Sequence, residues 1–468
     1  MRQSYIVDAK SPLQAMPRLA GPVLAEETLT LAVTWTDWWL CGHYLAHYGD
    51  SAKAAMGLMG YTMWLIPTMF AAVAIGTTAL VSRYVGKNDM PTANRTAHQS
   101  FLIGALFAII LTILFALLGS QFIGAMQLRN EAAGFARQYL WVIVPIIPLI
   151  MVEQVGAACL RGAGDTVTGM VAKGLVVITN IFVSTSLITG WGPFPEMGWV
   201  GLAIGTATGH ALGGLILLIV LVKGRVGLKL GLVGMKPDFS LLKKLLRVGL
   251  PGGADLAALL GAQLVFVALV NSLGESAAAA HGLAVQIEAC AFLPGHAFQV
   301  AAATLAGQYL GAGKPALATR GALYCFFSAC AIMVVAATIM YFYGEYIAYF
   351  FTGDWDDPTT HNAARLLKIV AFALPSLAFL MVISGALRGA GDTIWPLAFT
   401  LTGFLLIRIP LAAYLSCDTM QIPLVGWEFQ GLGWGVNGCW YAMAVDLTVR
   451  AFLTCMRFVH GGWKNIKI

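Results

Sequence analysis

The chain has 468 residues, of which 59% are hydrophobic and only 11% are charged. A soluble protein of this length needs roughly 25% charged residues to cover its surface, so cytosolic enzymes and secreted disulfide scaffolds are excluded. The formal net charge of +6 does not indicate a nucleic-acid partner, because the basic residues interrupt long apolar runs and form no basic recognition helix. Composition therefore places the chain in a lipid bilayer.

Long apolar runs recur from one end of the chain to the other. A transmembrane helix needs about 20 mainly apolar residues, whereas strands of a membrane barrel would show short alternating segments. Splitting the runs at Gly, Pro, Asn and charged breaks predicts twelve helices, at 19–46, 54–82, 95–119, 133–157, 166–189, 199–223, 241–271, 277–309, 316–343, 362–386, 393–416 and 432–459. We therefore predict an all-α integral membrane fold with twelve transmembrane helices.

The loops between these helices differ sharply in Lys and Arg content. Arg408 lies within a predicted helix, and with the N-terminus inside, nearly all other basic residues fall on the cytoplasmic side. The outer segments hold only Lys53, Arg129, Arg137, Arg365 and Lys368. The positive-inside rule then predicts cytoplasmic N- and C-termini for a multi-pass protein of the plasma (inner) membrane. The polar N-terminal segment shows no secretory cleavage pattern.

An internal duplication divides the chain. The heptapeptide Leu-Arg-Gly-Ala-Gly-Asp-Thr at residues 160–166 returns unchanged at residues 387–393. Because each half contains an even number of helices, the two halves enter the membrane in the same orientation, as parallel repeats do.

This duplication predicts two pseudo-symmetric six-helix lobes, residues 1–223 and 241–468, joined by a basic cytoplasmic linker at 224–240. Two such lobes favour alternating access with substrate held between them. A channel would require a filter-like segment, and the sequence shows none.

The repeated heptapeptide lies at the junction between helices four and five and again between helices ten and eleven. Its glycines permit a tight reversal, and Asp165 or Asp392 can cap the helix that follows. A glycine-rich phosphate cradle is the alternative, but the strand and the lysine that such a cradle needs are missing.

With these turns the chain resembles the multidrug and toxic compound extrusion (MATE) transporters over nearly its full length. The residues that carry the resemblance are Pro22 with an acid after it, Thr36-Asp37-Trp38-Trp39, both repeated turns, Asn180-Ile181, the segments 192–196, 286–295 and 307–315, and Arg408-Ile-Pro410. The resemblance implies a V-shaped pair of six-helix lobes that exports amphipathic, often cationic compounds in exchange for H⁺ or Na⁺.

The resemblance also implies a coupling site in the N-terminal lobe. Its acid in the first helix maps onto Asp37, its asparagine in the fifth helix onto Asn180 and its threonine in the sixth helix onto Thr206. The family's second carboxylate falls at Ser184, so this chain lacks one acid there. Another branch of the family binds its cation with acids in helices seven and ten, but the first of these falls near Leu259 and the tenth helix holds no acid. H⁺ is therefore favoured over Na⁺, which Asp37 and Asn180 would hold transiently.

Independently of the family, ionisable residues at bilayer depth are costly and mark functional sites. At bilayer depth we expect one base, Arg408, and seven acids: Glu26, Glu27, Asp37, Glu153, Asp255, Glu288 and Asp446. Seven acids cannot all pair with one base, so some must bind a proton or a cation, face water, or lie near a helix end. This excess is what a cation or proton exchanger requires.

Two of these acids share a face of the first helix. Glu26 and Asp37 are eleven residues apart, which places them within about 20° of each other around the helix and about 16 Å apart along it. We expect Asp37 to bind and release the coupling proton, with Asn180 and Ser184 as neighbours on one face of the fifth helix and Glu26 as a proton relay. Alternatively, Glu26 and Glu27 lie near the cytoplasmic headgroups, where Arg18 or a loop binds their carboxylates. The alternative for Asn180 is that it only forms a hydrogen bond between helices.

In the C-terminal lobe, His281 and Glu288 share a face of the eighth helix, and Arg408 lies in the eleventh. We expect this polar cluster to contain a structural ion pair between Glu288 and Arg408, because a lone buried arginine is costly. Asp255 and Asp446 are expected at water-exposed helix ends, and Glu153 is expected to pair with Arg161.

Aromatic and methionine side chains gather around the first two helices. Trp35, Trp38, Tyr61 and Met63 are candidates for the wall of a substrate cavity, because aromatic faces and flexible thioethers suit varied apolar cations. An interfacial aromatic belt has the same sequence pattern.

Two other classes of function remain as alternatives. A lipid-linked oligosaccharide flippase has the same two-lobed architecture but needs a cavity rich in Arg and Lys. A membrane enzyme is disfavoured, because no nucleophile, His-rich metal set or nucleotide motif is evident. We expect no cofactor besides the coupling ion, small organic molecules as substrates, and function as a monomer in the bilayer.

Overall fold

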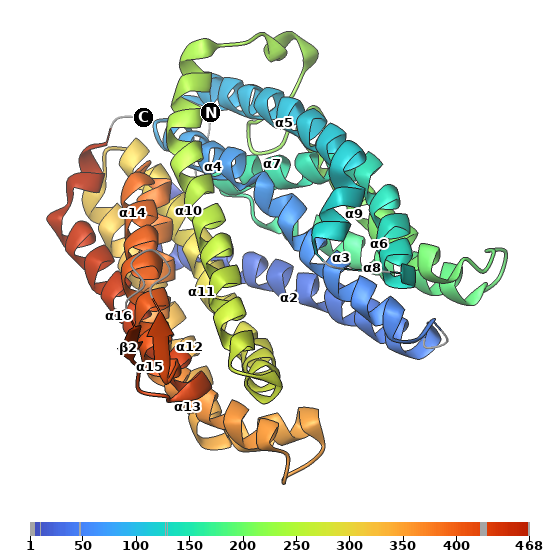
Figure 1. Cartoon of the computed structure of the whole chain (residues 1–468). Coiled ribbons are helices and arrows are strands. Elements are labelled where there is room, and N and C mark those ends of the chain that lie inside the picture. Colours follow the sequence, from blue (N-terminus) through green and yellow to red (C-terminus); the bar gives the residue numbers. More distant parts are fainter. Residues whose placement is uncertain are drawn as a thin grey trace. The chain divides into compact units, whose positions relative to one another are not determined.

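The computed structural model describes residues 5–9, 11–45, 48–126, 128, 130–421 and 428–466. The helices of the first half are α1 (Tyr5–Asp8), α2 (Pro12–Tyr44), α3 (Gly49–Met69), α4 (Ala71–Gly86), α5 (Met90–Ala125), α6 (Asn130–Ile143), η2 (Val144–Ile146), α7 (Ile147–Ala163), α8 (Val167–Thr189), α9 (Gly198–Lys223) and η3 (Leu232–Met235). Figure 1 shows these helices in chain order from blue to green.

The second half is also helical. Its elements are α10 (Phe239–Ser272), α11 (Glu275–Gly311), α12 (Pro315–Thr352), α13 (Pro358–Gly389), α14 (Ile394–Thr402), η4 (Gly403–Arg408), α15 (Ile409–Ser416), α16 (Gly435–His460) and η5 (Gly462–Asn465). A short hairpin precedes α16, in which β1 (Thr419–Gln421) and β2 (Glu428–Gln430) pair antiparallel. Among the predicted outer basic residues, Arg129 lies outside the described residues.

The twelve-helix prediction is confirmed. Ten helical stretches of the described chain are long and apolar enough to cross a membrane, and α2 and α16 fill the first and last predicted positions. Those two contain acids and bases, which lowers their hydropathy. Three predicted helices are composite: α3 continues into α4 after Phe70, α6 reaches α7 through η2, and α14 reaches α15 through the π-helix η4. The protein is therefore a multi-pass membrane protein.

Contacts divide the chain into two compact units whose boundary differs from the expected linker. Unit 1 comprises residues 1–8, 17–253 and 311–313, and unit 2 comprises the remainder. Segment 224–240 belongs to unit 1 because it is hydrogen-bonded to α5. The Gln99 side chain donates to the Lys236 carbonyl and accepts from the Asp238 amide, and His98 accepts from the Gly231 amide. The basic segment is thus anchored to the first lobe.

The repeated heptapeptide forms the same reversal twice. Gly164 and Gly391 have φ angles of 95° and 89°, a region that favours glycine. The Asp165 backbone amide donates to the Leu160 carbonyl oxygen, and the Asp392 amide to the Leu387 carbonyl oxygen, both at 2.8 Å. The tight reversal predicted for both copies is therefore present.

The aspartates of the two copies have different partners. Asp165 accepts from the Thr168 amide, so it caps α8 as expected, and it also accepts from Arg225 at 2.7 Å. Asp392 accepts instead from Arg457 of α16. Burial alone raises the pKa of both carboxyls, but the bonds from Arg225 and Thr168 outweigh it and hold the pKa of Asp165 below its usual value, while that of Asp392 stays raised. Asp165 thus binds the first turn to Arg225, just after α9, and Asp392 binds the second turn to Arg457, near the end of α16.

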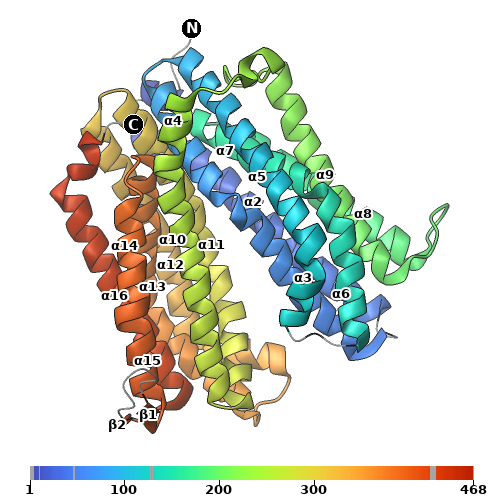
Figure 2. The same ribbon diagram turned by 45° about the horizontal axis from the view of Figure 1, so that its top comes forward.

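A ladder of glycines brings α9 against α8 in unit 1. The four glycines recur every fourth residue, at Gly201, Gly205, Gly209 and Gly213. A Cβ atom at Gly205 would lie 2.7 Å from the Ser184 amide nitrogen, and one at Gly209 would lie 2.9 Å from the Val176 carbonyl oxygen. Small residues at this spacing let two helix backbones approach closely. Figure 2 shows the two helices side by side.

Gly205→Ala is expected to separate α8 from α9. The new methyl group has no room beside the Ser184 backbone, so we expect a loss of about 1–3 kcal/mol in the free energy of unfolding, measured by denaturant titration in detergent. Gly57→Ala is the matched control, because a Cβ there meets nothing within 4 Å. Equal stability of the two variants would contradict close packing at Gly205.

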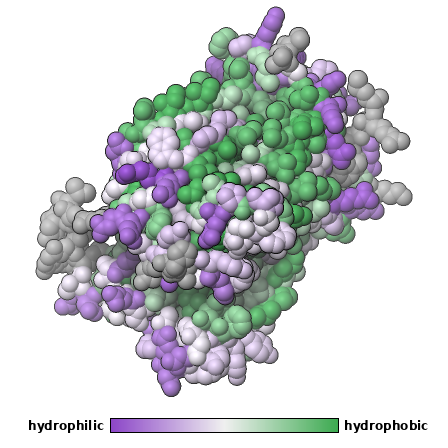
Figure 3. All heavy atoms as spheres, turned by 90° about the vertical axis from the view of Figure 1, so that its right-hand side faces the viewer, coloured by the Kyte–Doolittle hydropathy of each residue, from purple (hydrophilic) through white to green (hydrophobic). Residues whose placement is uncertain are grey.

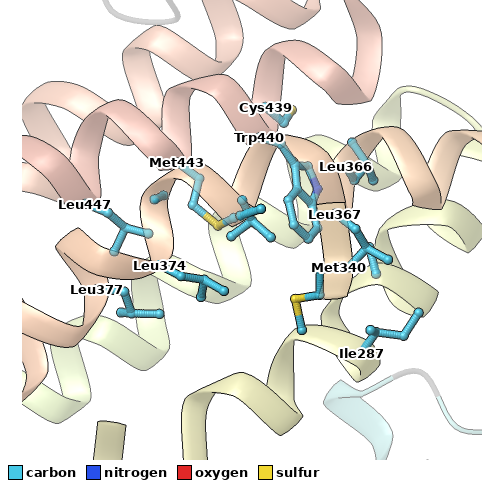
Figure 4. Close-up of a cluster of buried hydrophobic side chains, with 14 of the residues drawn as sticks. Ile287, Met340, Leu366, Leu367, Leu374, Leu377, Cys439, Trp440, Met443 and Leu447 are labelled. Atoms are coloured by element: carbon cyan, nitrogen blue, oxygen red, sulfur yellow. The ribbon is translucent and has the colours of Figure 1, made fainter. Parts of the chain in front are cut away.

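The core of unit 2 is built mainly by α12, α13 and α16. Trp440 is fully buried beside Leu366, Leu367, Leu374 and Met443, and Figure 4 shows these side chains converging from neighbouring helices. Because α13 is buried on several sides, its apolar residues follow no single stripe. This core holds α16 in place and thereby positions the charged residues of that helix.

Large apolar side chains also cover part of the outside. On α5, Leu106, Ile110, Ile113 and Leu117 are exposed at helical spacing, and Figure 3 shows a broad apolar area on one face with polar residues around it. An exposed apolar surface of this extent is costly in water and is expected for helices that contact lipid.

Candidate functional site

Three helices of unit 1 bring the predicted coupling residues together. Asp37 comes from α2, Asn180 and Ser184 from α8, and Thr206 from α9, and each side chain is at most 4% exposed. The Thr206 hydroxyl lies 3.2 Å from Asp37 Oδ2, to which it donates, and it accepts from Asn180 Nδ2 at 3.2 Å. Thr206 therefore links the first and fifth helices of the lobe.

The structure adds a residue to this site that the sequence did not indicate. Tyr139 of α6 is buried, and its hydroxyl donates to Thr206 Oγ1 at 3.1 Å. Tyr139 lies between Gln138 and Leu140, and this pattern does not distinguish it from an ordinary membrane aromatic. Only the packing of α6 against α9 reveals its contact.

Several buried oxygen atoms at the site lack a hydrogen-bond partner among the described residues: Asp37 Oδ1, Asn180 Oδ1 and Ser184 Oγ. A buried acceptor without a donor costs about 1–3 kcal/mol. A proton on Asp37, or a small cation held by these oxygens, would satisfy them. The described residues contain no group of three or more His, Cys, Asp or Glu that could hold a metal ion, so the oxygens offer one carboxylate and neutral ligands only.

A second acid of α2 lies toward the end of unit 1 where the repeated turn lies, which we call the inner end. Glu26 of α2 forms an ion pair with Arg161 of α7 at 3.6 Å, and its Oε2 atom is buried without a partner. Arg161, the arginine of the repeated turn, is thus the base beside Glu26, for which the alternative interpretation named Arg18 or a loop. Glu26 is eleven residues before Asp37 on α2, so this ion pair lies about 16 Å from Asp37 toward the inner end.

The expected pair between Glu153 and Arg161 is wrong. Glu153 is 5% exposed and accepts from Lys173 Nζ and from His210 Nδ1, both at 2.7 Å. Lys173 lies six residues inside α8 and is not a loop residue, so it reaches Glu153 from the neighbouring helix. We call Glu153, Lys173 and His210 the Glu153 cluster.

In unit 2, the expected pair between Glu288 and Arg408 is also wrong. Arg408 Nε donates to Asp446 Oδ2 at 2.8 Å, and Arg450 donates to both oxygens of the same carboxylate. Asp446 was expected at a water-exposed helix end, and this is wrong, because it is 0% exposed. Arg408, Asp446 and Arg450 form a buried triad.

The π-helix η4 explains why this triad forms. Its six residues run from Gly403 to Arg408, and such bulges turn side chains away from the regular helical register. Gly403 leaves space for Asp446 and Arg450, both of which a Cβ there would meet. The Arg408 and Arg450 guanidinium groups lie 4.4 and 4.8 Å from the centre of the Phe404 ring.

The other two members of the predicted polar cluster lie apart from this triad. His281 Nδ1 accepts from Trp440 Nε1 at 3.2 Å and packs against Phe266. Phe266 also faces the Arg408 guanidinium at 5.6 Å, so an aromatic ring separates the two groups. Glu288 is partly buried, and no ion pair of the described chain includes it.

Asp255 was likewise expected at a water-exposed helix end, and this is wrong. It is 1% exposed and accepts from Arg388 Nη2 at 2.5 Å. Arg388 is the arginine of the second repeated turn, as Arg161 is of the first. Each copy of the turn therefore supplies an arginine to an acid of its own unit.

The predicted cavity-wall residues are largely on the surface of unit 1. Trp35, Trp38 and Tyr61 are 60%, 42% and 68% exposed, and Met63 is partly buried. Such exposure fits both a cavity wall and an interfacial belt. A separate cavity of about 690 Å³ opens in unit 2 between α13 and α16, and none of the predicted site residues lines it.

The MatE family model matches residues 22–185 and 254–414 of the chain, which include the parts of α2 and α8 that hold Asp37 and Asn180. The chain is 27% identical to a probable multidrug resistance protein NorM of Thermotoga maritima over 96% of this chain and 92% of that protein. It is 26% identical to the multidrug resistance protein PmpM of Pseudomonas aeruginosa, with coverage of 98% and 93%.

Solved structures share the fold. One is the outward-facing conformation of a multidrug resistance MATE family transporter of the MOP superfamily, with a TM-score of 0.88, 21% identity and full coverage of both chains. The structure of a MOP superfamily transporter from Pyrococcus furiosus also has a TM-score of 0.88, with 21% identity and full coverage of both chains. A MATE structure in complex with MaL6 has a TM-score of 0.86 at 21% identity and covers 99% of this chain and all of that one.

Proposed function

The chain belongs to the MatE family of MATE transporters, and on that premise we propose that it is a secondary active antiporter. It exports amphipathic, cationic organic compounds and takes up H⁺ in exchange by alternating access. The names of its relatives support multidrug efflux as its role. The two parallel repeats support alternating access, because duplicated helical lobes are the usual basis of that mechanism.

The Asp37 site is the observation that carries the coupling mechanism. The Asp37 carboxyl is 4% exposed, and its hydrogen-bond partner is a neutral hydroxyl, so no base of the described residues pairs with it. Asp37 Oδ2 is held by Thr206, and Oδ1 has no partner among the described residues, so Oδ1 is where a proton would be carried. Thr206, Asn180 and Tyr139 orient the carboxyl, since they form one hydrogen-bonded group around it.

Protons are favoured over sodium because of the ligands available. Na⁺ prefers several oxygen ligands with enough negative charge, and Ser184 offers a hydroxyl in place of a second carboxylate. One carboxylate with neutral oxygens is sufficient for a proton. Asp37 and Asn180 would be the ligands of Na⁺ if it were the coupling ion.

The distribution of basic residues supports an orientation with both termini in the cytoplasm of a plasma (inner) membrane. The inner end of unit 1, with Arg161 and the basic segment 224–240, then faces the cytoplasm. Protons enter from the outer end of α2 and leave toward this inner end.

The charges of the described structure favour this function over a lipid-linked oligosaccharide flippase. A flippase needs unpaired bases for a pyrophosphate, whereas Arg408 and Arg450 share Asp446, and Lys173 binds Glu153. Each of these buried bases therefore already binds a carboxylate. Asp37, by contrast, is a buried acid whose hydrogen-bond partners are neutral.

Dye uptake into everted membrane vesicles, in which the cytoplasmic side faces outward, tests the proposal. Proton and sodium gradients are imposed separately, and transport of a cationic dye such as ethidium is recorded for each. We expect the proton gradient alone to drive transport. Transport under the sodium gradient only would reassign the ion, and no response to either gradient would contradict antiport.

A further inference from the structure

Proton exchange at Asp37 leaves a gap on the inner side of the site. From Asp37 toward the inner end of α2, the next acids are Glu27 and Glu26. Glu26 is about 16 Å from Asp37 at 1.5 Å per residue, and Asp37 Oδ1 is buried. A proton cannot cross such a distance in one transfer between hydrogen-bonded groups. Another group must therefore receive it first.

The Glu153 cluster occupies this gap. His210 is four residues from Thr206 on α9, so it lies on the same helix face about 6 Å nearer the inner end. On α8, Lys173 is seven residues from Asn180, about 10 Å in the same direction. On both helices these are the first titratable side chains on the inner side of the Asp37 site.

The contacts within the cluster suit proton transfer. Glu153 uses its two oxygens separately, Oε1 for Lys173 and Oε2 for His210, each at 2.7 Å. With Lys173 fixing one oxygen, the other remains directed at the imidazole. Neutral His210 then donates from Nδ1, which leaves Nε2 as an acceptor. No hydrogen bond to Nε2 occurs among the described residues.

Carboxylates outnumber bases around His210. The titratable groups of the helices that surround it are Glu26 and Glu27 on α2, Tyr139 on α6, Glu153 and Arg161 on α7, and Lys173 on α8. Glu26 is paired with Arg161 and Glu153 with Lys173. Together with Glu27 these groups are three acids and two bases, so a positive charge on His210 would lie where carboxylates are in excess.

We propose that His210 and Glu153 form a second proton-binding site, which receives the proton leaving Asp37 and passes it to the inner end of unit 1. The proposal rests on the proton-coupled export proposed above. The O–H bond of Asp37 breaks as the Nε2–H bond of His210 forms, and the Nδ1–H bond breaks as an O–H bond forms at Glu153 Oε2, so one O–H bond replaces another and the imidazole ends neutral with its proton on Nε2. Glu153 then loses its proton toward Glu26, and exchange of the imidazole proton from Nε2 to Nδ1 through water restores the first tautomer.

His210→Asn tests the second site. The Asn amide can donate to Glu153 from nearly the position of Nδ1, but it carries no exchangeable charge. In proteoliposomes with an imposed pH gradient, we expect ethidium exchange to slow at least about tenfold and its solvent deuterium isotope effect to rise. Equilibrium binding of ethidium, with its dependence on pH, stays as in the wild type because Asp37 is intact. His210→Gln is the second variant if His210→Asn folds poorly.

The matched control is His361→Asn. His361 Nδ1 also binds a glutamate, Glu345, at 2.8 Å, but that pair is exposed and lies in unit 2. We expect wild-type exchange from this control. Wild-type exchange by the His210 variants would overturn the second site, as would a slowing matched by equal losses of ethidium binding and melting temperature. If Asp37→Asn keeps full exchange, the proposed function itself fails, whatever the His210 variants do.

Discussion

Asp37→Asn is expected to abolish proton-driven efflux while leaving the protein folded. The amide has nearly the same shape as the carboxyl and still accepts from Thr206, which lies 3.2 Å from Oδ2, but it cannot bind or release a proton. Dye transport in everted vesicles should fall to the level of vesicles without the protein. Ethidium binding to the purified variant should no longer depend on pH.

The control for this variant is Asp356→Asn, which removes an exposed acid between α12 and α13. Its transport and its melting temperature should equal those of the wild type. Efflux by Asp37→Asn at the wild-type rate would disprove the coupling role of Asp37. A large drop in melting temperature would instead show that Asp37 has a structural role.

Asp446→Ala is expected to cause the largest loss of stability. It removes the carboxylate that Arg408 and Arg450 share, and both arginines are at most 4% exposed. Breaking a buried ion pair in this way typically costs about 3–5 kcal/mol, because a charge is left without compensation. Denaturant unfolding of the purified protein in detergent measures the loss, and low expression would accompany it.

Two comparisons isolate the cause of this loss. Glu288→Gln should be nearly neutral for stability, because no described ion pair includes Glu288. Replacing the whole triad with Arg408→Met, Asp446→Leu and Arg450→Met should recover much of the stability, since no charge then remains buried. A stable Asp446→Ala protein would contradict the importance of the triad.

The structure also suggests why the chain retains two kinds of buried charge. In unit 2, a single carboxylate binds two arginines beside the π-helix, and these contacts fix α16 against the α14–α15 segment. In unit 1, the buried acid Asp37 has only neutral partners, and the nearest paired acids lie toward the inner end. In the first arrangement both carboxylate oxygens have guanidinium partners, while in the second Asp37 Oδ1 has no partner among the described residues.

Much of the fold was predictable because its determinants are local or exactly repeated. Apolar runs of membrane length located the twelve helices, and the heptapeptide at 160–166 and 387–393 revealed the duplication. Both features follow from the bilayer, which requires each spanning segment to satisfy its own backbone hydrogen bonds. The assembly of Asp37, Asn180 and Thr206 followed from the family resemblance, since these residues are up to 169 positions apart.

The partners of the buried charges were decided by the tertiary structure alone. Glu153 binds Lys173 and His210 in place of Arg161, and Asp446 takes the place of Glu288 beside Arg408. Such pairings depend on the rotation of each helix about its axis and on local deviations such as the π-helix at Gly403–Arg408, neither of which is encoded in hydropathy. The sequence thus located the acids within the helices, and packing decided which bases, including Lys173 and Arg450, lie beside them, because an ion pair forms only where helix contacts bring its atoms within a few ångströms.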